Sequence, residues 1–323
     1  MAKTSRLDPP SSILHSQCFF LAGPTAVGKS EMALLLAEKI GGEIISVDSM
    51  QVYRGLDIGT AKPSAEERTR ARHHLIDAMD LAESFDAAKF VQLANAAVSE
   101  IQSRGRVPIF CGGTGLYFKA FLEGLGEAPA ADGALRAELE AMPLEALLAE
   151  LAEKDHATFE KIDRNNPRRV VRAVEVIRLT GKPFSMQKAQ WADPVAGGKK
   201  SGLDGVSPHL VGLSRETNDL RARIDARVEA MFARGLVEEA RRLLEHGLAE
   251  NKTAMQALGY RQVVEHLRGE RPLPETVELV KIKTRQFAKR QMTWFKRQLN
   301  LRWLELSPNQ EADAIVEKIA SDS

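Results

Sequence analysis

Short apolar runs alternate with amphipathic stretches over the first third of the chain. A run that is apolar at every position, or rich in β-branched residues, is typical of a parallel strand buried on both faces. Stretches that place Leu, Ala and Val at helical spacing and then meet glycine are typical of helices. The predicted strands lie at 18–22, 43–47 and 107–111, and the predicted helices lie at 31–40 and 87–103. Alternation of this kind implies a doubly wound, mostly parallel α/β sheet.

The pattern changes in the middle of the chain, where Ala, Leu and Glu dominate up to Lys154. A helix is predicted to begin with Asn166 as its N-cap and to run to Thr180. A glycine-containing segment then leads back to a strand at 209–213. We therefore predict two domains: a helical insertion at 126–205, and a core formed by 17–125 and 206–318.

The last third of the chain is predicted to be helical, with helices near 218–234, 237–246 and 276–300. The composition, with 44% apolar residues in 323, allows a sizeable core. The formal charge is only +1, from 45 basic and 44 acidic residues. Any nucleic-acid partner must therefore meet a local basic surface, because the overall charge offers no attraction.

Cysteine usage and hydropathy exclude several classes of protein. Cys18 and Cys111 lie inside apolar strands, so we expect buried free thiols and no disulfide. No Cys/His cluster has the spacing of a zinc site, and no apolar run is long enough to span a membrane. Residues 1–12 lack the apolar segment of a signal peptide. We expect a cytoplasmic monomer that does not bind a membrane.

A complete phosphate-binding loop motif, G-x-x-x-x-G-K-[ST], lies between the first predicted strand and the first predicted helix. Its backbone N–H groups and the helix N-terminus are expected to face phosphate oxygens, Lys29 to add a full charge, and Ser30 to bind Mg²⁺. The alternative is an incidental glycine turn with an exposed lysine. The predicted phosphate-binding residues are Gly23, Pro24, Thr25, Ala26, Val27, Gly28, Lys29 and Ser30.

Routine ATP or GTP hydrolysis is disfavoured, because an ordinary P-loop hydrolase carries an Asp after an apolar strand to help hold Mg²⁺. Here the strand at 107–111 runs into Gly112-Gly113-Thr114-Gly115. Asp48 instead follows the second strand, so it is expected at the same carboxyl edge of the sheet as the phosphate-binding loop. A carboxylate in that position indicates that Asp48 accepts a proton. The alternative is that Asp48 is the N-cap of a helix.

Several further blocks occur in an order that resembles the bacterial type of tRNA dimethylallyltransferase. Besides the phosphate-binding loop, the blocks that carry the resemblance are 48–53, 57–63, 73–77, 112–117, 166–176, 223–228, 256–261 and 284–295. The resemblance covers roughly residues 17 to 305. It implies a P-loop NTPase-like sheet with a helical insertion domain and a helical C-terminal third.

The resemblance also implies a reaction. The dimethylallyl group of dimethylallyl diphosphate would pass to the N6 amine of the adenosine 3′ of the anticodon, in tRNAs that read codons starting with U. By the resemblance, Asp48 would accept the amine proton, Thr114 would bind near the reacting centre, and Arg223 would hold the diphosphate with Mg²⁺ present. Without the family, Arg223 would be interpreted as an exposed helix arginine that pairs with Asp219 or Asp225.

The expected partner is the anticodon stem-loop of tRNA, and basic residues gather in two places that fit it. Residues 281–302 contain eight basic and no acidic side chains, and Lys281, Arg285 and Lys289 share one helical face. The alternative is a solvated basic face. The second place is the run Arg168, Arg169 and Arg172 in the predicted insertion. The resemblance implies this tRNA-binding set: Asp48, Ser49, Met50, Gln51, Thr114, Arg136, Arg168, Arg169, Arg172, Gln256, Gly259, Tyr260, Arg261, Lys289, Arg290 and Trp294.

Three other functions retain some of these features. A P-loop small-molecule kinase, or a prenyltransferase that acts on free adenine nucleotides, would keep Lys29, Ser30 and Asp48 but would need neither arginine-rich surface. A nucleotide-responsive RNA-binding protein without catalysis would need no proton acceptor.

Overall fold

The computed structural model describes residues 17–125, 128–187, 207–308 and 310–321. The chain divides into two compact units, one formed by Met1–Leu122 with Lys200–Ser323 and the other by Glu123–Lys199. The ends of the predicted insertion, at 126–127 and 188–205, lie outside the described residues.

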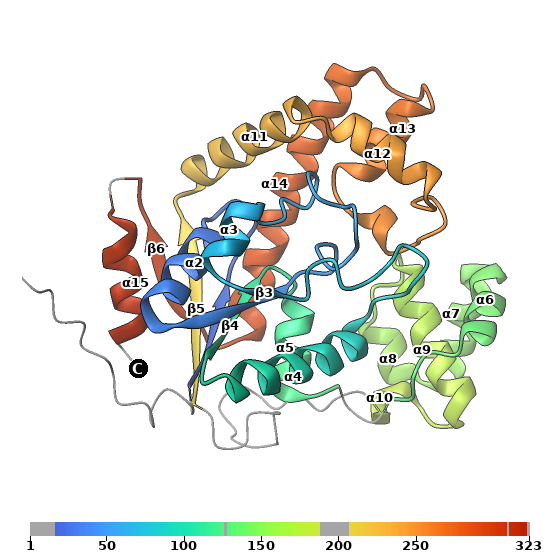
Figure 1. Cartoon of the computed structure of the whole chain (residues 1–323). Helices are drawn as coiled ribbons and strands as arrows, with labels where there is room; N and C mark the ends of the chain where they lie inside the picture. The colour runs from blue at the N-terminus through green and yellow to red at the C-terminus, as the bar shows by residue number, and fades with distance from the viewer. Residues whose placement is uncertain (1–16, 126–127, 188–206, 309, 322–323) are drawn as a thin grey trace, which may run out of the picture. The chain divides into compact units, whose positions relative to one another are not determined.

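A six-stranded sheet lies at the centre of the first unit (Figure 1). Its spatial order is β3-β2-β4-β1-β5-β6, and each neighbouring pair is parallel. The α/β prediction is therefore confirmed. The strands are β1 (Gln17–Ala22), β2 (Gly42–Val47), β3 (His73–His74), β4 (Val107–Gly112), β5 (Ser207–Arg215) and β6 (Arg302–Leu306).

Both faces of this sheet are buried, as the continuous apolar runs predicted. Phe20 and Phe110 stack on one face, which packs against α4 (Ala87–Ser103) and α5 (Gly115–Glu123). Phe19 and Leu21 point to the other face, which is covered by α2 (Lys29–Ile40) and α15 (Ala312–Ser321). Burial of each such side chain stabilises the fold by about 1.5–3 kcal/mol. The carboxyl ends of the strands, which the polar segments follow, are therefore held in place by the core.

The helices after β5 belong to the same unit. Three of them follow the predicted segments closely, namely α11 (Thr217–Ala233), α12 (Leu236–Glu245) and α14 (Leu273–Gln298), whereas α13 (Tyr260–Leu267) was not predicted. α14 packs on α11 and α13, and its Ala288 and Phe295 are buried in the core. The short helix α3 (Ala65–Arg70) begins with a capping box between Ser64 and Glu67.

The second unit is helical and has a core of its own. It contains α6 (Gly133–Ala141), α7 (Leu144–Lys154), α8 (His156–Lys161), α9 (Pro167–Thr180) and α10 (Phe184–Gln187). The Asn166 side chain accepts a hydrogen bond from Arg169 N–H, and Gly181 ends α9 with a φ of 68°. The predicted start and end of this helix are confirmed.

Two further expectations concern the whole chain. Cys18 and Cys111 are buried free thiols, as predicted. Within the described ranges, no helix combines the length and apolar character that crossing a membrane requires.

Candidate active site

Polar segments follow three neighbouring strands at the carboxyl edge of the sheet. The phosphate-binding loop follows β1, Asp48 follows β2, and Thr114 follows β4. Because parallel strands end at the same edge, the fold brings these segments together. The Thr114 N–H donates to the carbonyl of Val47 at 3.2 Å, which ties the turn after β4 to the end of β2.

The phosphate-binding loop combines left-handed and right-handed backbone conformations. Gly28 has a φ of 110° and Ala26 a φ of 63°, and α2 begins directly afterwards at Lys29. A left-handed residue beside right-handed ones produces the concave row of N–H groups that binds anions. The Lys29 ammonium donates to the carbonyl of Pro24 at 2.7 Å, so it lies under the loop.

Two arginines of α11 point at this loop. Arg223 Nε donates to the carbonyl of Ala26 at 3.1 Å, and Arg227 donates to the Thr25 hydroxyl at 3.3 Å. The alternative that Arg223 pairs with acids of its own helix does not hold, because Asp219 pairs with Arg215 and Asp225 pairs with Arg285. A cavity of about 450 Å³ is lined by Ala26, Gly28, Lys29, Ser30, Glu31, Glu67, Arg223, Ala226 and Arg227.

Sequence reasoning missed Arg227 and Arg215. Arg227 lies one helical turn after Arg223, and this i,i+4 spacing was the available signal. Arg215 ends β5, and its side chain is 9% exposed while its Nε donates to the Val27 carbonyl at 2.8 Å. The signal for Arg215 was its position at the carboxyl end of a predicted strand.

Desolvation shapes the charges around the cavity. Burial lowers the pKa of Lys29 to about 8, although the nearby charge of Asp48 acts in the opposite direction. Burial also lowers the pKa of Arg227, and Asp48 opposes this shift as well. An arginine stays charged even so. Lys29, Arg227 and Asp48 thus lie close enough to interact. The cavity itself is lined by three basic side chains, Lys29, Arg223 and Arg227, and by two acidic ones, Glu31 and Glu67, while Asp48 lies outside this lining.

Asp48 forms hydrogen bonds within a turn through only one of its two carboxylate oxygens. Its Oδ1 accepts hydrogen bonds from Met50 N–H at 2.8 Å and Gln51 N–H at 3.2 Å. The residue therefore caps a turn and not a helix, since the next helix after β2 begins only at Ala65, and it lies at the carboxyl edge of the sheet. The cap uses Oδ1 alone, so Oδ2 is available as an acceptor.

Gln51 has an amide whose orientation is fixed. Its Nε2 donates to the carbonyls of Thr60 and Ala61 at 3.1 and 3.2 Å, and its Oε1 accepts from the Ser46 hydroxyl at 2.8 Å. Both donor hydrogens are therefore used, and only Oε1 retains a free lone pair. Ser49 and Met50 precede it in the same turn, and both are half-buried.

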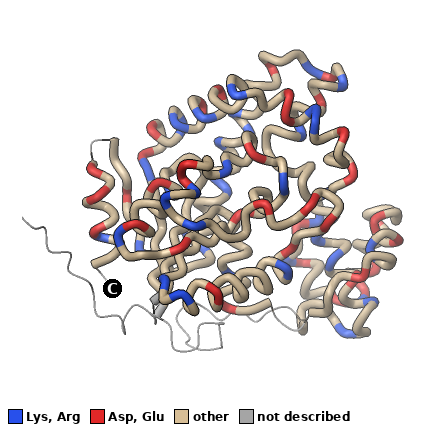
Figure 2. Tube along the Cα trace, viewed as in Figure 1, with Lys and Arg blue, Asp and Glu red and all other residues tan. Residues whose placement is uncertain are grey.

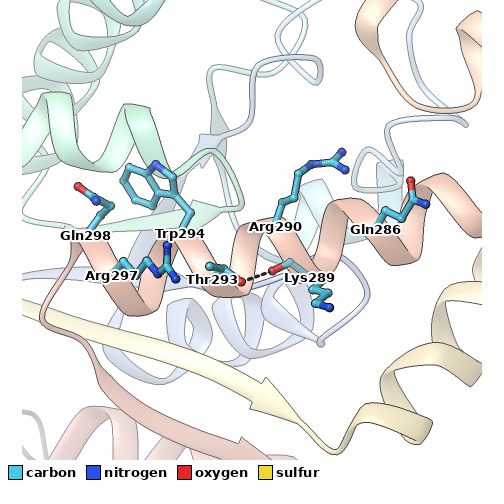
Figure 3. A pocket seen from close by; sticks show the side chains of 7 residues that line it. All are labelled: Gln286, Lys289, Arg290, Thr293, Trp294, Arg297 and Gln298. Atoms are coloured by element: carbon cyan, nitrogen blue, oxygen red, sulfur yellow. Dashed lines mark hydrogen bonds between the residues drawn. The ribbon is translucent and has the colours of Figure 1, made fainter. Parts of the chain in front are cut away.

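The outer face of α14 carries the basic groove that the sequence predicted in part. A cavity of about 520 Å³ runs along this helix, and Figure 3 shows its lining side chains, which are Gln286, Lys289, Arg290, Thr293, Trp294, Arg297 and Gln298. The indole of Trp294 also packs on the turn after β4, since a Cβ added at Gly115 would lie 2.1 Å from its ring.

The prediction of one cationic face from Lys281 to Lys289 is wrong for its first two members. Lys281 is 9% exposed and binds Glu229 at 2.8 Å and Glu278 at 2.6 Å. Arg285 forms a two-bond pair with Asp225 of α11 at 2.7 and 2.8 Å. The acids come from a different helix or an adjacent turn, so spacing within 281–302 could not reveal them. Basic and acidic residues are interleaved in the same way along most elements (Figure 2).

The arginines of the second unit divide into two kinds. Arg136 and Arg172 both bind the fully buried carboxylate of Glu175, at 2.5 and 2.7 Å. Burial by itself would raise the pKa of Glu175, but the bonds from Arg172 and Arg136 outweigh it and hold the pKa below its usual value. Arg168 and Arg169 are exposed in the first turn of α9.

The block at 256–261 is only partly on the surface. Gln256 and Arg261 are exposed, and Arg261 pairs with Glu265 at 3.1 Å. Gly259 and Tyr260 are buried, and the Tyr260 hydroxyl bonds to Glu239. In this conformation Tyr260 can influence a ligand only through its neighbours.

Ser30 is the available protein ligand for a metal beside bound phosphate. Ser30 lies exposed in the first turn of α2 and lines the cavity beside the phosphate-binding loop. Among the residues that the structure describes, no group of three His, Cys, Asp or Glu side chains is arranged to hold a metal by itself. Mg²⁺ typically takes one or two protein ligands and completes its shell with phosphate oxygens and water, so this site fits it.

Comparisons with known proteins agree across sequence and structure. The family model described as IPP transferase matches residues 51–298. A protein of Trichlorobacter lovleyi named tRNA dimethylallyltransferase 1 is 45% identical over 295 residues, which is 90% of this chain and 93% of that protein. The tRNA dimethylallyltransferase of Geobacter metallireducens is 46% identical over 289 residues, covering 88% of this chain and 90% of the relative.

Solved structures give the same result. The tRNA isopentenylpyrophosphate transferase of Bacillus halodurans superposes with a TM-score of 0.67 and 38% identity, covering 95% of this chain and 96% of that one. A eukaryotic dimethylallyltransferase, described as acting on tRNA, gives a TM-score of 0.74 and 26% identity, with 95% of this chain and 77% of that chain covered.

Proposed function

Because the chain belongs to the IPP transferase family, whose curated members here are tRNA dimethylallyltransferases, we propose that it transfers a dimethylallyl group from dimethylallyl diphosphate to tRNA. The acceptor is the N6 amine of the adenosine 3′ of the anticodon, in tRNAs that read codons starting with U. The observation that carries the proposal is the group of three basic side chains, Lys29, Arg223 and Arg227, at the phosphate-binding loop, with the carboxylate of Asp48 near enough to Lys29 and Arg227 to affect their pKa values.

The adenine amine is a weak nucleophile, because its lone pair is delocalised into the ring. Transfer therefore needs an electrophile whose leaving group departs easily. As the bond between C1 of the dimethylallyl group and the diphosphate oxygen breaks, the bond from N6 to C1 forms and negative charge collects on the diphosphate. Lys29, Arg223, Arg227 and the loop N–H groups stabilise that charge. Mg²⁺ held by Ser30 and the diphosphate would supply further positive charge there.

The attacking nitrogen must also lose a proton. Asp48 is the carboxylate at this edge, and its Oδ2 accepts the N6 proton while Oδ1 keeps the turn in place. Gln51 offers the remaining lone pair of Oε1 to the second N6 hydrogen, since both of its own hydrogens are used. An amino group fits between two acceptors, whereas the O6 of guanine would not. Thr114 supplies a hydroxyl at the same edge.

tRNA would be held by exposed cations on both units. We assign Lys289, Arg290 and Trp294 of the α14 groove to phosphate and base contacts, together with Arg168 and Arg169 of α9. An adenosine near the anticodon must leave its stack to reach a phosphate-binding loop, and a single-stranded loop permits this at low cost. Arg136 and Arg172 contribute through the shape of the second unit, and Gln256 and Arg261 through exposed side chains.

The test is the transfer of radiolabel from dimethylallyl diphosphate to unmodified tRNA with Mg²⁺, alongside AMP and ATP as competing acceptors. Asp48→Asn is the informative variant, because its Oδ1 can still cap the turn while it cannot take a proton as a carboxylate does. We expect label in tRNA alone and a loss of about 10²–10⁴-fold in Asp48→Asn. Label on AMP would show that the protein is a nucleotide prenyltransferase. No label on any acceptor would contradict the proposal and leave a kinase or an RNA-binding protein as the alternatives.

A further inference from the structure

A glutamine of α14 connects two loops of the site that are far from it in the sequence. Gln291 is 8% exposed and points inward, away from the basic groove. Its Oε1 accepts the Thr25 N–H of the phosphate-binding loop at 2.9 Å, and its Nε2 donates to the Gly113 carbonyl at 2.9 Å. The two bonds span 266 and 178 residues of chain.

The chemistry of this contact requires an amide. One partner is a donor and the other an acceptor, so the contact needs an acceptor and a donor on the same side chain at the same reach. Glutamate would offer no hydrogen to Gly113, and methionine would offer neither function. The approach is also close, because a Cβ added at Gly113 would lie 2.2 Å from Nε2 of Gln291.

The joined loops have different tasks in the proposed reaction. The phosphate-binding loop holds the leaving diphosphate, and the turn at 113–115 carries Thr114 and is bonded to the end of β2 just before Asp48. Fixing one loop against the other therefore sets the distance between the leaving group and the proton acceptor. A misplacement of about 1 Å at a reacting centre can cost about 10²-fold in rate.

We propose that Gln291 is a positioning residue, which holds the phosphate-binding loop and the Thr114 turn in register for group transfer. This rests on the proposed function. Gln291 lies in the same helical turn as Lys289 and Arg290, whose side chains line the groove in Figure 3, and Trp294 packs on Gly115 one turn later. The helix that would receive RNA is thereby bonded directly to the loops that carry out the chemistry.

The experiment compares Gln291→Met, which keeps length and removes both bonds, with Gln291→Glu, which keeps the acceptor for Thr25 alone. The matched control is Gln102→Met, a half-buried glutamine near the C-terminal end of α4, at the opposite edge of the sheet. The readouts are the single-turnover rate with enzyme in excess, which does not depend on the folded fraction, and the Kd for tRNA. Circular dichroism melting checks that each variant folds.

We expect both Gln291 variants to lose at least about tenfold in the single-turnover rate while the Kd for tRNA changes less than about threefold. Gln102→Met should leave both quantities unchanged. A folded Gln291→Met or Gln291→Glu protein that reacts within twofold of the wild type would overturn the inference, and so would a loss confined to tRNA affinity. If the unaltered protein transfers no label, the proposed function fails first, so the two failures are distinguishable.

Discussion

The hydroxyl of Tyr260 donates a 2.5 Å hydrogen bond to Oε1 of Glu239, whose carboxylate is 5% exposed. The same hydroxyl accepts Gly59 N–H at 3.1 Å, and both oxygens of Glu239 accept Ile58 N–H at 3.0 Å. Burial and the neighbouring carboxylate raise the pKa of Tyr260, so it stays a proton donor. The pair thus holds the loop whose next two carbonyls, of Thr60 and Ala61, orient Gln51.

Removing the Tyr260 hydroxyl tests whether this pair acts on the site. Tyr260→Phe leaves no cavity but takes one bond from a buried carboxylate and one from a backbone N–H, at a cost of about 1–3 kcal/mol in unfolding free energy. We expect the transfer rate to fall about tenfold because Gln51 loses its fixed orientation. Chemical denaturation and single-turnover kinetics measure the two effects.

The Kd for tRNA separates this explanation from a direct contact. A buried Tyr260 predicts an unchanged Kd in Tyr260→Phe. A variant with normal turnover and weakened tRNA binding would instead place the hydroxyl against RNA and refute the positioning role.

The sequence predicted those strands and helix ends that are determined by residues close together in the chain. The apolar runs gave the buried strands, and the pair Asn166 and Gly181 gave both ends of α9, because a cap is a contact within a few residues. β6 was not predicted, since five residues of alternating character at the sheet edge carry little signal.

The candidate site was predictable to the extent that its residues sit in strand-end motifs. The places of Lys29 and Asp48 follow from the predicted strands that precede them, because parallel strands end at one edge, whereas Thr114 was expected there through the family resemblance. Gln291 could not be found this way, since its partners lie 178 and 266 residues away. The pairs of Lys281 with Glu229 and of Arg285 with Asp225 could not be found for the same reason, because both acids belong to α11.

Donor binding should depend on the protonation of Lys29. Its pKa of about 8 in the free protein lies below the usual lysine value because of burial, and a bound diphosphate raises it again. Below pH 8 the ammonium is already charged, so affinity is constant there. Above pH 8 binding must take up a proton, and we expect the Kd of dimethylallyl diphosphate to rise about tenfold per pH unit.

Calorimetric titration from pH 7 to 9.5 measures this dependence, and proton uptake appears as a buffer-dependent enthalpy. Lys29→Met should bind more weakly and show no such change across the same window. A wild-type Kd that stays flat to pH 9.5 would show that Lys29 remains charged throughout.

Lys289 and Arg285, both on α14, should differ in their effect on tRNA binding. Lys289 lines the groove, whereas Arg285 is held by Asp225. Each cation that meets a phosphate contributes about one unit to the slope of log K against log salt. We expect Lys289→Gln to reduce that slope by about 0.7–0.9 and Arg285→Gln to leave it nearly unchanged.

Filter binding of tRNA between 50 and 300 mM salt, about the range over which such slopes are measured, provides the comparison. Equal slopes for the two variants would mean that the pair between Arg285 and Asp225 opens when RNA binds, and the groove would then extend further along α14.

Arg227 should matter for catalysis more than Arg221, which lies on the same helix. It is half-buried at the phosphate-binding loop, where charge on the departing diphosphate increases in the transition state, while Arg221 is exposed on the same helix. Because a preorganised cation in a desolvated site favours the more charged state, Arg227→Gln should lower kcat by about 10²-fold or more. Arg221→Gln, the matched control, should change kcat less than twofold. The KM for dimethylallyl diphosphate decides what kind of contact is lost: a raised KM at normal kcat would mean that Arg227 binds donor and transition state equally.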